Sequence, residues 1–229
     1  MKAVVFDFDE TLTRNSPNIW RSIWQNLGYP TDKNSYYVEL YMQFINEEIT
    51  HQQWNVLTCE AFKQQNMNRS LLDKLAKDIT LIDGIDETMQ TLKSNGFSLH
   101  IVSGNIDTVI EDVLGDKAKY FDSINANKFL YNDENKLSYI IPTKYDFQGK
   151  SQFVSELIDK NGIRPSDIYY IGDGPNDEWV YETGCNTLCL NPTTPNFNNK
   201  RIWNNTIHNS SNLTDILSIV LTKDFNRDR

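Results

Sequence analysis

Two aspartates near the N-terminus are spaced so that they could serve one site. Asp7 and Asp9 follow the apolar run of residues 3–6, which predicts a short strand buried on both faces. If this strand continues through Asp9, the two carboxylates lie on one face and close together. Buried anions repel each other and lose solvation, and a bound cation relieves most of that cost. Oxygen ligands of this kind suit Mg²⁺, although aspartates that only cap a turn would explain the same pair.

A hydroxyl group lies where a second strand is predicted to end. The apolar run 98–102 predicts that strand, and Ser103, Gly104 and Asn105 separate it from a helical pattern that starts at Ile106. A hydroxyl and free backbone N–H groups at a helix N-terminus favour an anion. An ordinary helix cap would explain Ser103 equally well.

A lysine lies at an unexpected position near the start of another predicted helix. Phe153, Val154, Leu157 and Ile158 have the spacing of one helix face, which places Lys150 in the first turn. The helix dipole slightly disfavours a cation at that end. A functional role for Lys150 therefore competes with the simpler interpretation of an exposed, solvated side chain.

The strand predicted at 168–171 leads into a turn with two more aspartates. Asp173 follows at the carboxyl end of that strand, and the flanking glycines let the backbone turn sharply. Asp177 comes four residues later, where it could simply cap the next helix. Ligands of open α/β sheets bind outside the carboxyl ends of the strands. We therefore expect the three strand ends to converge on one site.

The elements that position these residues alternate as in an α/β fold. We expect a Rossmann-like parallel sheet flanked by helices, with a hairpin at 132–135 inside an otherwise irregular segment, 121–148. The predicted strands are 3–6, 98–102, 168–171 and 187–190, and the predicted helices include 85–95, one from 106, one around 153–158 and one near 213–221.

The segment from 14 to 80 has a different pattern. Four amphipathic stripes predict helices there, the first over residues 16–28 with Ser16 as its cap. Because this segment interrupts one α/β domain beside a strand-end site, it is a natural lid. The predicted domains are therefore an α/β core of residues 1–13 and 81–229 and a helical cap of residues 14–80.

Aromatic residues are frequent in the predicted cap. Trp20, Trp24, Tyr37 and Tyr41 recur at helical spacing, and packing inside a helical unit would explain them. The same rings could instead shape a pocket for a larger or less charged ligand. The spacing leaves both interpretations open.

Composition argues against several classes of protein. The 229 residues are 39% hydrophobic, enough for a sizeable core, and the formal net charge of -9 argues against nucleic-acid or anionic-membrane partners. No apolar run approaches the roughly 18 residues of a membrane-spanning helix, and no secretory leader pattern precedes the first strand. We therefore expect a cytoplasmic protein. The three cysteines form no disulfide or zinc pattern, and the oligomeric state stays open.

Four motifs in a fixed order resemble those of the haloacid dehalogenase (HAD) superfamily. The motifs are Asp7-Phe8-Asp9-Glu10-Thr11, Ser103, Lys150 and Gly172-Asp173-Gly174-Pro175-Asn176-Asp177. The resemblance spans residues 4 to about 190. A helical insertion between the first and second motifs is most similar to the phosphoserine-phosphatase-like branch.

The resemblance implies a Mg²⁺-dependent phosphatase acting on a small phosphorylated metabolite through an aspartyl-phosphate. Asp7 would be the nucleophile, and Asp9 would protonate the leaving oxygen and then activate water. The other implied roles are phosphate binding by Ser103, Gly104 and Lys150, metal binding by Asp7, Asp173 and the backbone carbonyl of Asp9, and support by Thr11, Asn176 and Asp177.

Two residues depart from the pattern of phosphoserine phosphatases. Glu10 stands where those enzymes usually carry Ser, and Ser16 stands where they carry a Glu that binds the substrate amine. The resemblance therefore leaves the substrate open. A phosphomutase or phosphotransferase of the same superfamily would replace water by another acceptor. A phospho-accepting signalling domain uses similar residues, but Asp9 argues against it because a DxD pair supplies its own acid–base group.

Overall fold

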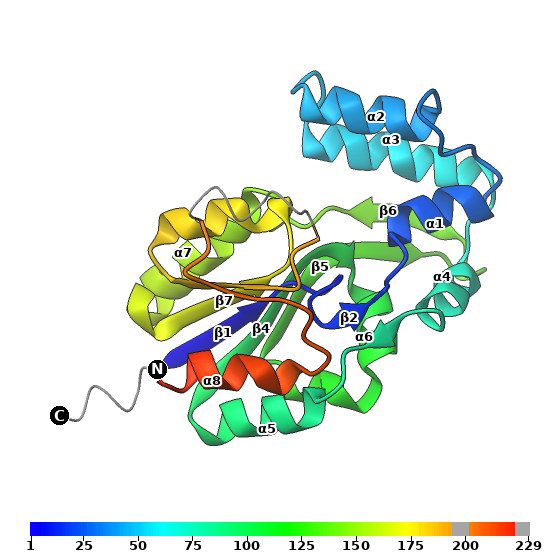
Figure 1. Ribbon diagram of the computed structural model, residues 1–229. Coiled ribbons are helices and arrows are strands. Elements are labelled where there is room, and N and C mark those ends of the chain that lie inside the picture. Colours follow the sequence, from blue (N-terminus) through cyan, green and yellow to red (C-terminus); the bar gives the residue numbers. More distant parts are fainter. Residues whose placement is uncertain (194–201, 223–229) are drawn as a thin grey trace.

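The computed structural model describes residues 1–193 and 202–222, and a seven-stranded sheet forms its centre (Figure 1). From edge to edge the strands are β6 (Leu137–Ile141), β5 (Ser123–Tyr131), β4 (Phe97–Ile106), β1 (Lys2–Phe6), β7 (Ile168–Gly172), β8 (Asn186–Leu190) and β9 (Asn205–Ile207). All neighbours are parallel except β5 and β6, which form an antiparallel hairpin. This topology confirms the predicted α/β, Rossmann-like fold.

The first strand lies in the middle of the sheet and is buried on both faces, as predicted. Val4 and Phe6 pack into the cluster on one face, Ala3 and Val5 pack into the cluster on the other, and all four are 0% exposed. The strand ends at Phe6, so Asp7 and Asp9 follow it and do not continue it. The two aspartates therefore do not share one face of an extended strand, contrary to the prediction that assumed a strand through Asp9.

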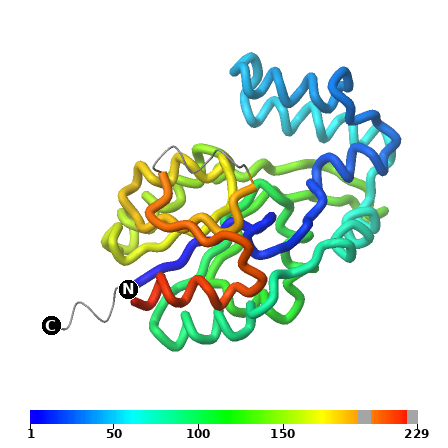
Figure 2. Tube along the Cα trace, in the orientation of Figure 1, coloured from blue at the N-terminus to red at the C-terminus, as the bar shows by residue number. Residues whose placement is uncertain are grey.

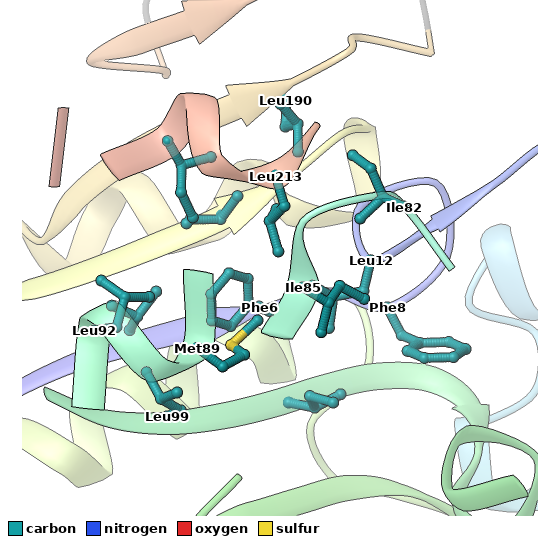
Figure 3. Packing of buried hydrophobic residues seen from close by; sticks show 14 of the residues in the cluster. Phe6, Phe8, Leu12, Ile82, Ile85, Met89, Leu92, Leu99, Leu190 and Leu213 are labelled. Carbon is teal, nitrogen blue, oxygen red and sulfur yellow. The ribbon is translucent and has the colours of Figure 1, made fainter. Parts of the chain in front are cut away.

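Helices cover both faces of the sheet. One face carries α5 (Ile85–Ser94), α6 (Asp107–Leu114), a 3-10 helix at Gly115–Tyr120, and α8 (Leu217–Val220), which continues a 3-10 turn at Leu213–Ile216. Figure 3 shows Met89 and Leu92 of α5 against Phe6 and Leu99. The other face carries α7 (Gly149–Asn161) and a 3-10 helix at Pro175–Thr183. A further 3-10 turn spans Pro165–Asp167.

The strands β2 (Thr13–Arg14) and β3 (Thr80–Leu81) pair as a short antiparallel ribbon, and four helices lie between them in the sequence. They are α1 (Ile19–Asn26), α2 (Tyr36–Ile45), α3 (His51–Gln64) and α4 (Arg69–Ala76). The blue and cyan pair α2 and α3 lies away from the sheet, at the top of the view in Figure 2. The hydrophobic core of the four-helix segment includes Trp24, Phe62 and Leu72, and it also includes Phe129 and Ile140 of the β5–β6 hairpin. The division into a core and a cap stays a prediction.

Local capping explains where the helices of this segment begin. The side chain of Asn18 accepts a hydrogen bond from the Arg21 backbone N–H at 2.9 Å, so α1 begins at Ile19 and the predicted cap at Ser16 is wrong. Thr50 and Gln53 form a reciprocal capping box at the start of α3. The other three predicted helix patterns of the segment match α2, α3 and α4.

Several elements differ from the prediction. Strand β4 continues to Ile106 with a shift in its pairing to β5 after Val102, so the predicted polar turn is part of the strand end. Residues 121–148, expected to be mostly irregular, contain β5 and β6 around the predicted hairpin turn. The short strands β2, β3 and β9 were not predicted, because two or three residues carry no readable alternation. No helix in the described residues is long and apolar enough to cross a membrane.

Candidate active site

Asp7 lies at the carboxyl end of the central strand and is almost completely buried. Its backbone N–H donates to the Ile171 carbonyl at 2.8 Å, which ties it to β7. One carboxylate oxygen, Oδ1, accepts the Phe8 backbone N–H at 2.7 Å, and Oδ2 lies 3.0 Å from the Lys150 ammonium. Burial raises the pKa of Asp7 to about 6, although Lys150 opposes the shift.

Lys150 comes from the first turn of α7 and is fully buried, so the interpretation as an exposed lysine is wrong. Its ammonium lies between two carboxylates, 3.0 Å from Asp7 Oδ2 and 2.7 Å from Asp177 Oδ1. Burial alone would lower the pKa of Lys150, but the charges of Asp177 and Asp7 outweigh burial and raise it. The side chain is therefore charged, and these ion pairs hold it despite the helix dipole.

The Asp177 carboxylate is surrounded by hydrogen-bond donors. Its Oδ1 accepts Lys150 Nζ at 2.7 Å and the Tyr170 hydroxyl at 2.5 Å. Its Oδ2 accepts the backbone N–H groups of Asp173 and Gly174, at 3.2 and 3.3 Å. A Cβ at Gly172 would lie 2.3 Å from the same carboxylate, so a glycine is required there. Asp177 therefore orients Lys150 and the turn that carries Asp173.

Three buried carboxylates lie close enough to share one cation. Asp7, Asp173 and Asp177 each offer an oxygen within 4.8 Å of the others. Burial, followed by the charges of Asp7 and Asp177, raises the pKa of Asp173 to about 8. Lys150 neutralises only one of the three negative charges. Because Asp177 already accepts four hydrogen bonds, Asp7 and Asp173, whose carboxylates accept fewer, are the better candidates to coordinate a metal.

The residues expected to support the metal site lie next to it. The Thr11 hydroxyl donates to Asp173 Oδ1 at 3.4 Å, and the Asn176 amide donates to Asp7 Oδ2 at 3.5 Å. Thr11 is fully buried between the central strand and this turn. The donor set consists of hard oxygens with excess negative charge, and it fits a divalent cation such as Mg²⁺.

Asp9 lies in a different environment from Asp7. Both of its oxygens accept the Asn105 side-chain amide, at 2.9 and 3.0 Å, and Oδ1 also accepts the Ser16 hydroxyl at 3.4 Å. Burial, followed by the charge of Asp7, raises the pKa of Asp9 to about 7. Its side chain is therefore held by a neutral amide, and only its backbone carbonyl stays a predicted metal ligand.

Asn105 is a site residue that the sequence reasoning missed. It belongs to the same strand end as Ser103, and its side-chain oxygen accepts the Ile106 backbone N–H at 2.6 Å. The signal that could have found it is its position two residues after Ser103, where a strand-end side chain can reach the neighbouring strand end. Tyr170 was also missed, because it lies inside an apolar strand.

Ser103 and Gly104 lie where an anion could approach the aspartates. Ser103 is buried and accepts the Asn105 backbone N–H at 3.1 Å. The residue at the cap position of α6 is Ile106, so Ser103 is not the ordinary helix cap that was its alternative. A Cβ at Gly104 would lie 2.6 Å from an Asp146 carboxylate oxygen, so only glycine fits this approach.

A cavity of about 570 Å³ connects these strand ends with the inserted helices. Its core lining includes Asp7, Asp9, Ser103, Gly104, Asp146, Phe147, Asp173 and Asn176, and its lining from the inserted segment includes Trp20, Arg21, Tyr37, Tyr41, Met42 and Trp54. Lys150, Asp177 and Thr11 lie behind this surface. The structure thus brings all the predicted site residues to one edge of the sheet.

Several known proteins have a similar sequence or fold. The phosphoserine phosphatase of Methanocaldococcus jannaschii is 27% identical over 186 residues, which cover 77% of this chain and 79% of the relative. The phosphoserine phosphatase of Haemophilus influenzae is 28% identical over 121 residues, which cover 53% of this chain and 38% of the relative.

A solved structure described as a phospho-aspartyl intermediate analogue of phosphoserine phosphatase has a similar fold. It has a TM-score of 0.71 at 21% identity, and the match covers 96% of this chain and 98% of the other. The family model of haloacid dehalogenase-like hydrolases matches residues 4–178. The chain therefore belongs to the haloacid dehalogenase-like hydrolase family, as a phosphatase of the phosphoserine-phosphatase-like kind.

Proposed function

We propose that the protein hydrolyses a phosphate monoester of a small metabolite through an aspartyl-phosphate on Asp7, with Mg²⁺ as cofactor. The observation that carries this proposal is the opposite environment of two aspartates two positions apart. Asp7 faces the Lys150 ammonium at 3.0 Å, whereas Asp9 faces only neutral donors and has a pKa raised to about 7. The Lys150 charge favours the ionised form of Asp7 for attack, although burial raises the pKa of Asp7 to about 6, and Asp9 can carry a proton near neutral pH.

The first half-reaction transfers the phosphoryl group to Asp7. An Asp7 oxygen attacks phosphorus, the bond to the alcohol oxygen breaks, and Asp9 gives its proton to that oxygen. Ser103 and the Gly104 backbone bind the phosphoryl oxygens at the strand end. Lys150 holds Asp7 in place from behind and offsets the negative charge of the reacting groups. Bound Mg²⁺, held by Asp7, Asp173 and the Asp9 carbonyl, would neutralise charge on the phosphoryl group.

The second half-reaction returns Asp7 to its starting state. Asp9, now ionised, takes a proton from water, and that water attacks the phosphorus of the aspartyl-phosphate. The bond to Asp7 breaks, and inorganic phosphate leaves. The amide of Asn105 orients Asp9 toward the reacting oxygen in both steps. A base of this kind shortens the life of the intermediate, which favours a phosphatase over a signalling domain.

We further propose that residues 14–80 act as a cap over this reaction. The Trp20 indole N–H donates to the Gly104 carbonyl at 2.8 Å, so α1 is tied to the proposed phosphate-binding turn. The cavity wall opposite Asp7 comes from α1, α2 and α3. A cover of this kind excludes water other than the one that reacts.

The experiment measures phosphate release from 4-nitrophenyl phosphate with Mg²⁺ and with EDTA. Asp7→Asn should abolish turnover because an amide is a poor nucleophile. Asp9→Asn should slow the hydrolysis of an alkyl phosphate, whose leaving oxygen needs a proton, by about 10²- to 10⁴-fold, the usual contribution of general acid–base catalysis, and should slow that of 4-nitrophenyl phosphate less. Asp116→Asn removes an exposed carboxylate outside the site and should retain full activity. Full activity in EDTA, or wild-type turnover by Asp7→Asn, would contradict the proposal.

A further inference from the structure

The cavity wall opposite the aspartates is made largely of aromatic rings. Trp20, Tyr37, Tyr41, Trp54 and Phe147 line it. Tyr41 is 39% exposed and Met42 is 45% exposed, although both face a cavity that reaches Asp7. Exposed apolar surface inside a concave site marks a place for a ligand.

These rings form a continuous chain from the inserted helices to the core. The ring of Tyr41 lies 6.0 Å from that of Trp54, which stacks on Phe44 at 4.9 Å and 16°. Phe44 in turn lies 5.3 Å from Phe147, which follows β6 and precedes α7. The aromatic wall is therefore held from both sides of the cavity.

Phe147 has an unusual backbone conformation. Its φ of +46° lies in the left-handed region, which a bulky side chain rarely adopts. The Asp146 carboxylate holds its backbone N–H at 2.9 Å, and its carbonyl accepts the Lys150 backbone N–H at 3.0 Å. Strain of this kind persists where the surrounding structure fixes a residue for function. The ring is thus fixed between the proposed phosphate-binding turn and the helices.

Packing of the inserted helices accounts for only part of this wall, because Trp20, Tyr37 and Trp54 also pack against the helical core, whereas Tyr41 and Met42 stay exposed. Trp24 is only 2% exposed and packs on Phe62, so it belongs to the helical core. For Trp24, packing inside a helical unit is therefore the correct one of the two interpretations that the sequence left open. Tyr37, Val38, Tyr41 and Met42 instead share one face of α2 and line the cavity. Aromatic residues with the same helical spacing therefore have two roles in the structure: Trp24 packs in the helical core, and Tyr37 and Tyr41 line the cavity.

We propose that the alcohol half of the substrate carries a flat aromatic ring. This inference rests on the proposed phosphatase function. The ring lies against Tyr41 and Trp54 on one side and Phe147 on the other, while the phosphate lies at Ser103 and Gly104 facing Asp7. The cavity of about 570 Å³ falls within the range of sites for ring-containing ligands and is far larger than a short polar side chain requires.

The test compares two substrates that differ in the ring alone, which is flat and aromatic in one and saturated in the other. 2-Phenylethyl phosphate and 2-cyclohexylethyl phosphate have similar size and similar leaving groups. Because aromatic stacking adds to the burial of area, we expect kcat/KM to favour the phenyl compound by about 5-fold. Tyr41→Leu should reduce this ratio by about 2-fold or more, and losses common to both substrates cancel in it.

A matched control comes from the same helix. Tyr36 is 42% exposed but does not line the cavity, so Tyr36→Leu should leave the ratio unchanged. A wild-type ratio near one, or an equal fall in both variants, would overturn the inference. Self-association that Tyr41→Leu abolishes and Tyr36→Leu retains, measured by sedimentation, would assign this face to a second copy and would also overturn the inference.

Two further measurements separate this inference from the proposed function. Butyl phosphate is a phosphate monoester without a ring, so its Mg²⁺-dependent hydrolysis tests the proposed function alone. If it is hydrolysed while the two ring substrates are not distinguished, only the inference fails. If nothing is hydrolysed, calorimetry with 3-phenylpropylphosphonate and 3-cyclohexylpropylphosphonate decides: preference for the phenyl compound supports the ring site, and equal binding overturns it.

Discussion

Removing the amide that holds Asp9 should change the pH dependence of the reaction. In Asn105→Ala, both hydrogen bonds to the Asp9 carboxylate are lost, at 2.9 and 3.0 Å in the wild type. These bonds favour the ionised form, so their loss raises the pKa of Asp9 above its value of about 7. A hydrogen bond to a charged group contributes about 1.5–3 kcal/mol, and one pKa unit is about 1.4 kcal/mol. Because water will replace part of the lost amide, we expect an upward shift of about one unit.

The assay measures kcat/KM against pH for an alkyl phosphate, whose leaving oxygen needs a proton. Activity falls at high pH as Asp9 loses its proton, and this alkaline limb should move up by about one unit in Asn105→Ala. Asn105→Asp adds a negative charge beside Asp9 and should move the limb further. 4-Nitrophenyl phosphate serves as the control, because its leaving group needs little protonation and its limb should respond weakly. An alkaline limb that stays in place or moves down in both variants would refute the assignment of Asp9 as the acid.

Three other predictions concern stability and charge. The carboxyls of Asp7 and Asp173 have pKa values raised to about 6 and about 8, so the metal-free folded state binds more protons than the unfolded state and loses stability as pH rises from 4 to 8. Mg²⁺ should therefore raise the melting temperature more at pH 8 than at pH 5. An equal increase at the two pH values would contradict this. Lys150→Met leaves Asp7 and Asp177 without their shared cation and should lower the free energy of unfolding by about 3–5 kcal/mol in urea titrations without Mg²⁺; an unchanged value would count against the buried charge triad. Met89→Ala removes a fully buried side chain of α5 and should cost about 2–5 kcal/mol in the same titration, with kcat of the folded protein retained; loss of kcat would link this face to the site.

The fold could be predicted from short-range patterns where these were strong. Helices such as α3 have an apolar stripe and a local cap at Thr50, and β1 has an uninterrupted apolar run. The short strand β9 depends on pairing with β8, which no local signal encodes. The start of α1 was misplaced because Ser16 and Asn18 are both good caps and only contacts decide between them: Ser16 instead donates its backbone N–H to Glu10 at 2.6 Å.

The site could be predicted to the level of strand ends but not of contacts. Asp7 and Asp173 directly follow the parallel strands β1 and β7, and Ser103 lies in the last residues of the neighbouring parallel strand β4, so their convergence follows from topology. Which partner each side chain takes does not follow. Asn105 holds Asp9, which is 96 positions away in the sequence. Tyr170 holds Asp177, which is seven positions away. Only the folded chain shows these two contacts.

The most direct test of the account is to find the residue that becomes phosphorylated. Enzyme mixed with substrate is quenched in acid within milliseconds, the acyl phosphate is reduced with borohydride, and the N-terminal peptide is sequenced by mass spectrometry. The account predicts homoserine at position 7 in the wild type, none in Asp7→Asn, and accumulation in Asp9→Asn if water attack is slowed more than transfer. Modification at Asp9, or turnover with no modified aspartate, would contradict the division of roles between Asp7 and Asp9.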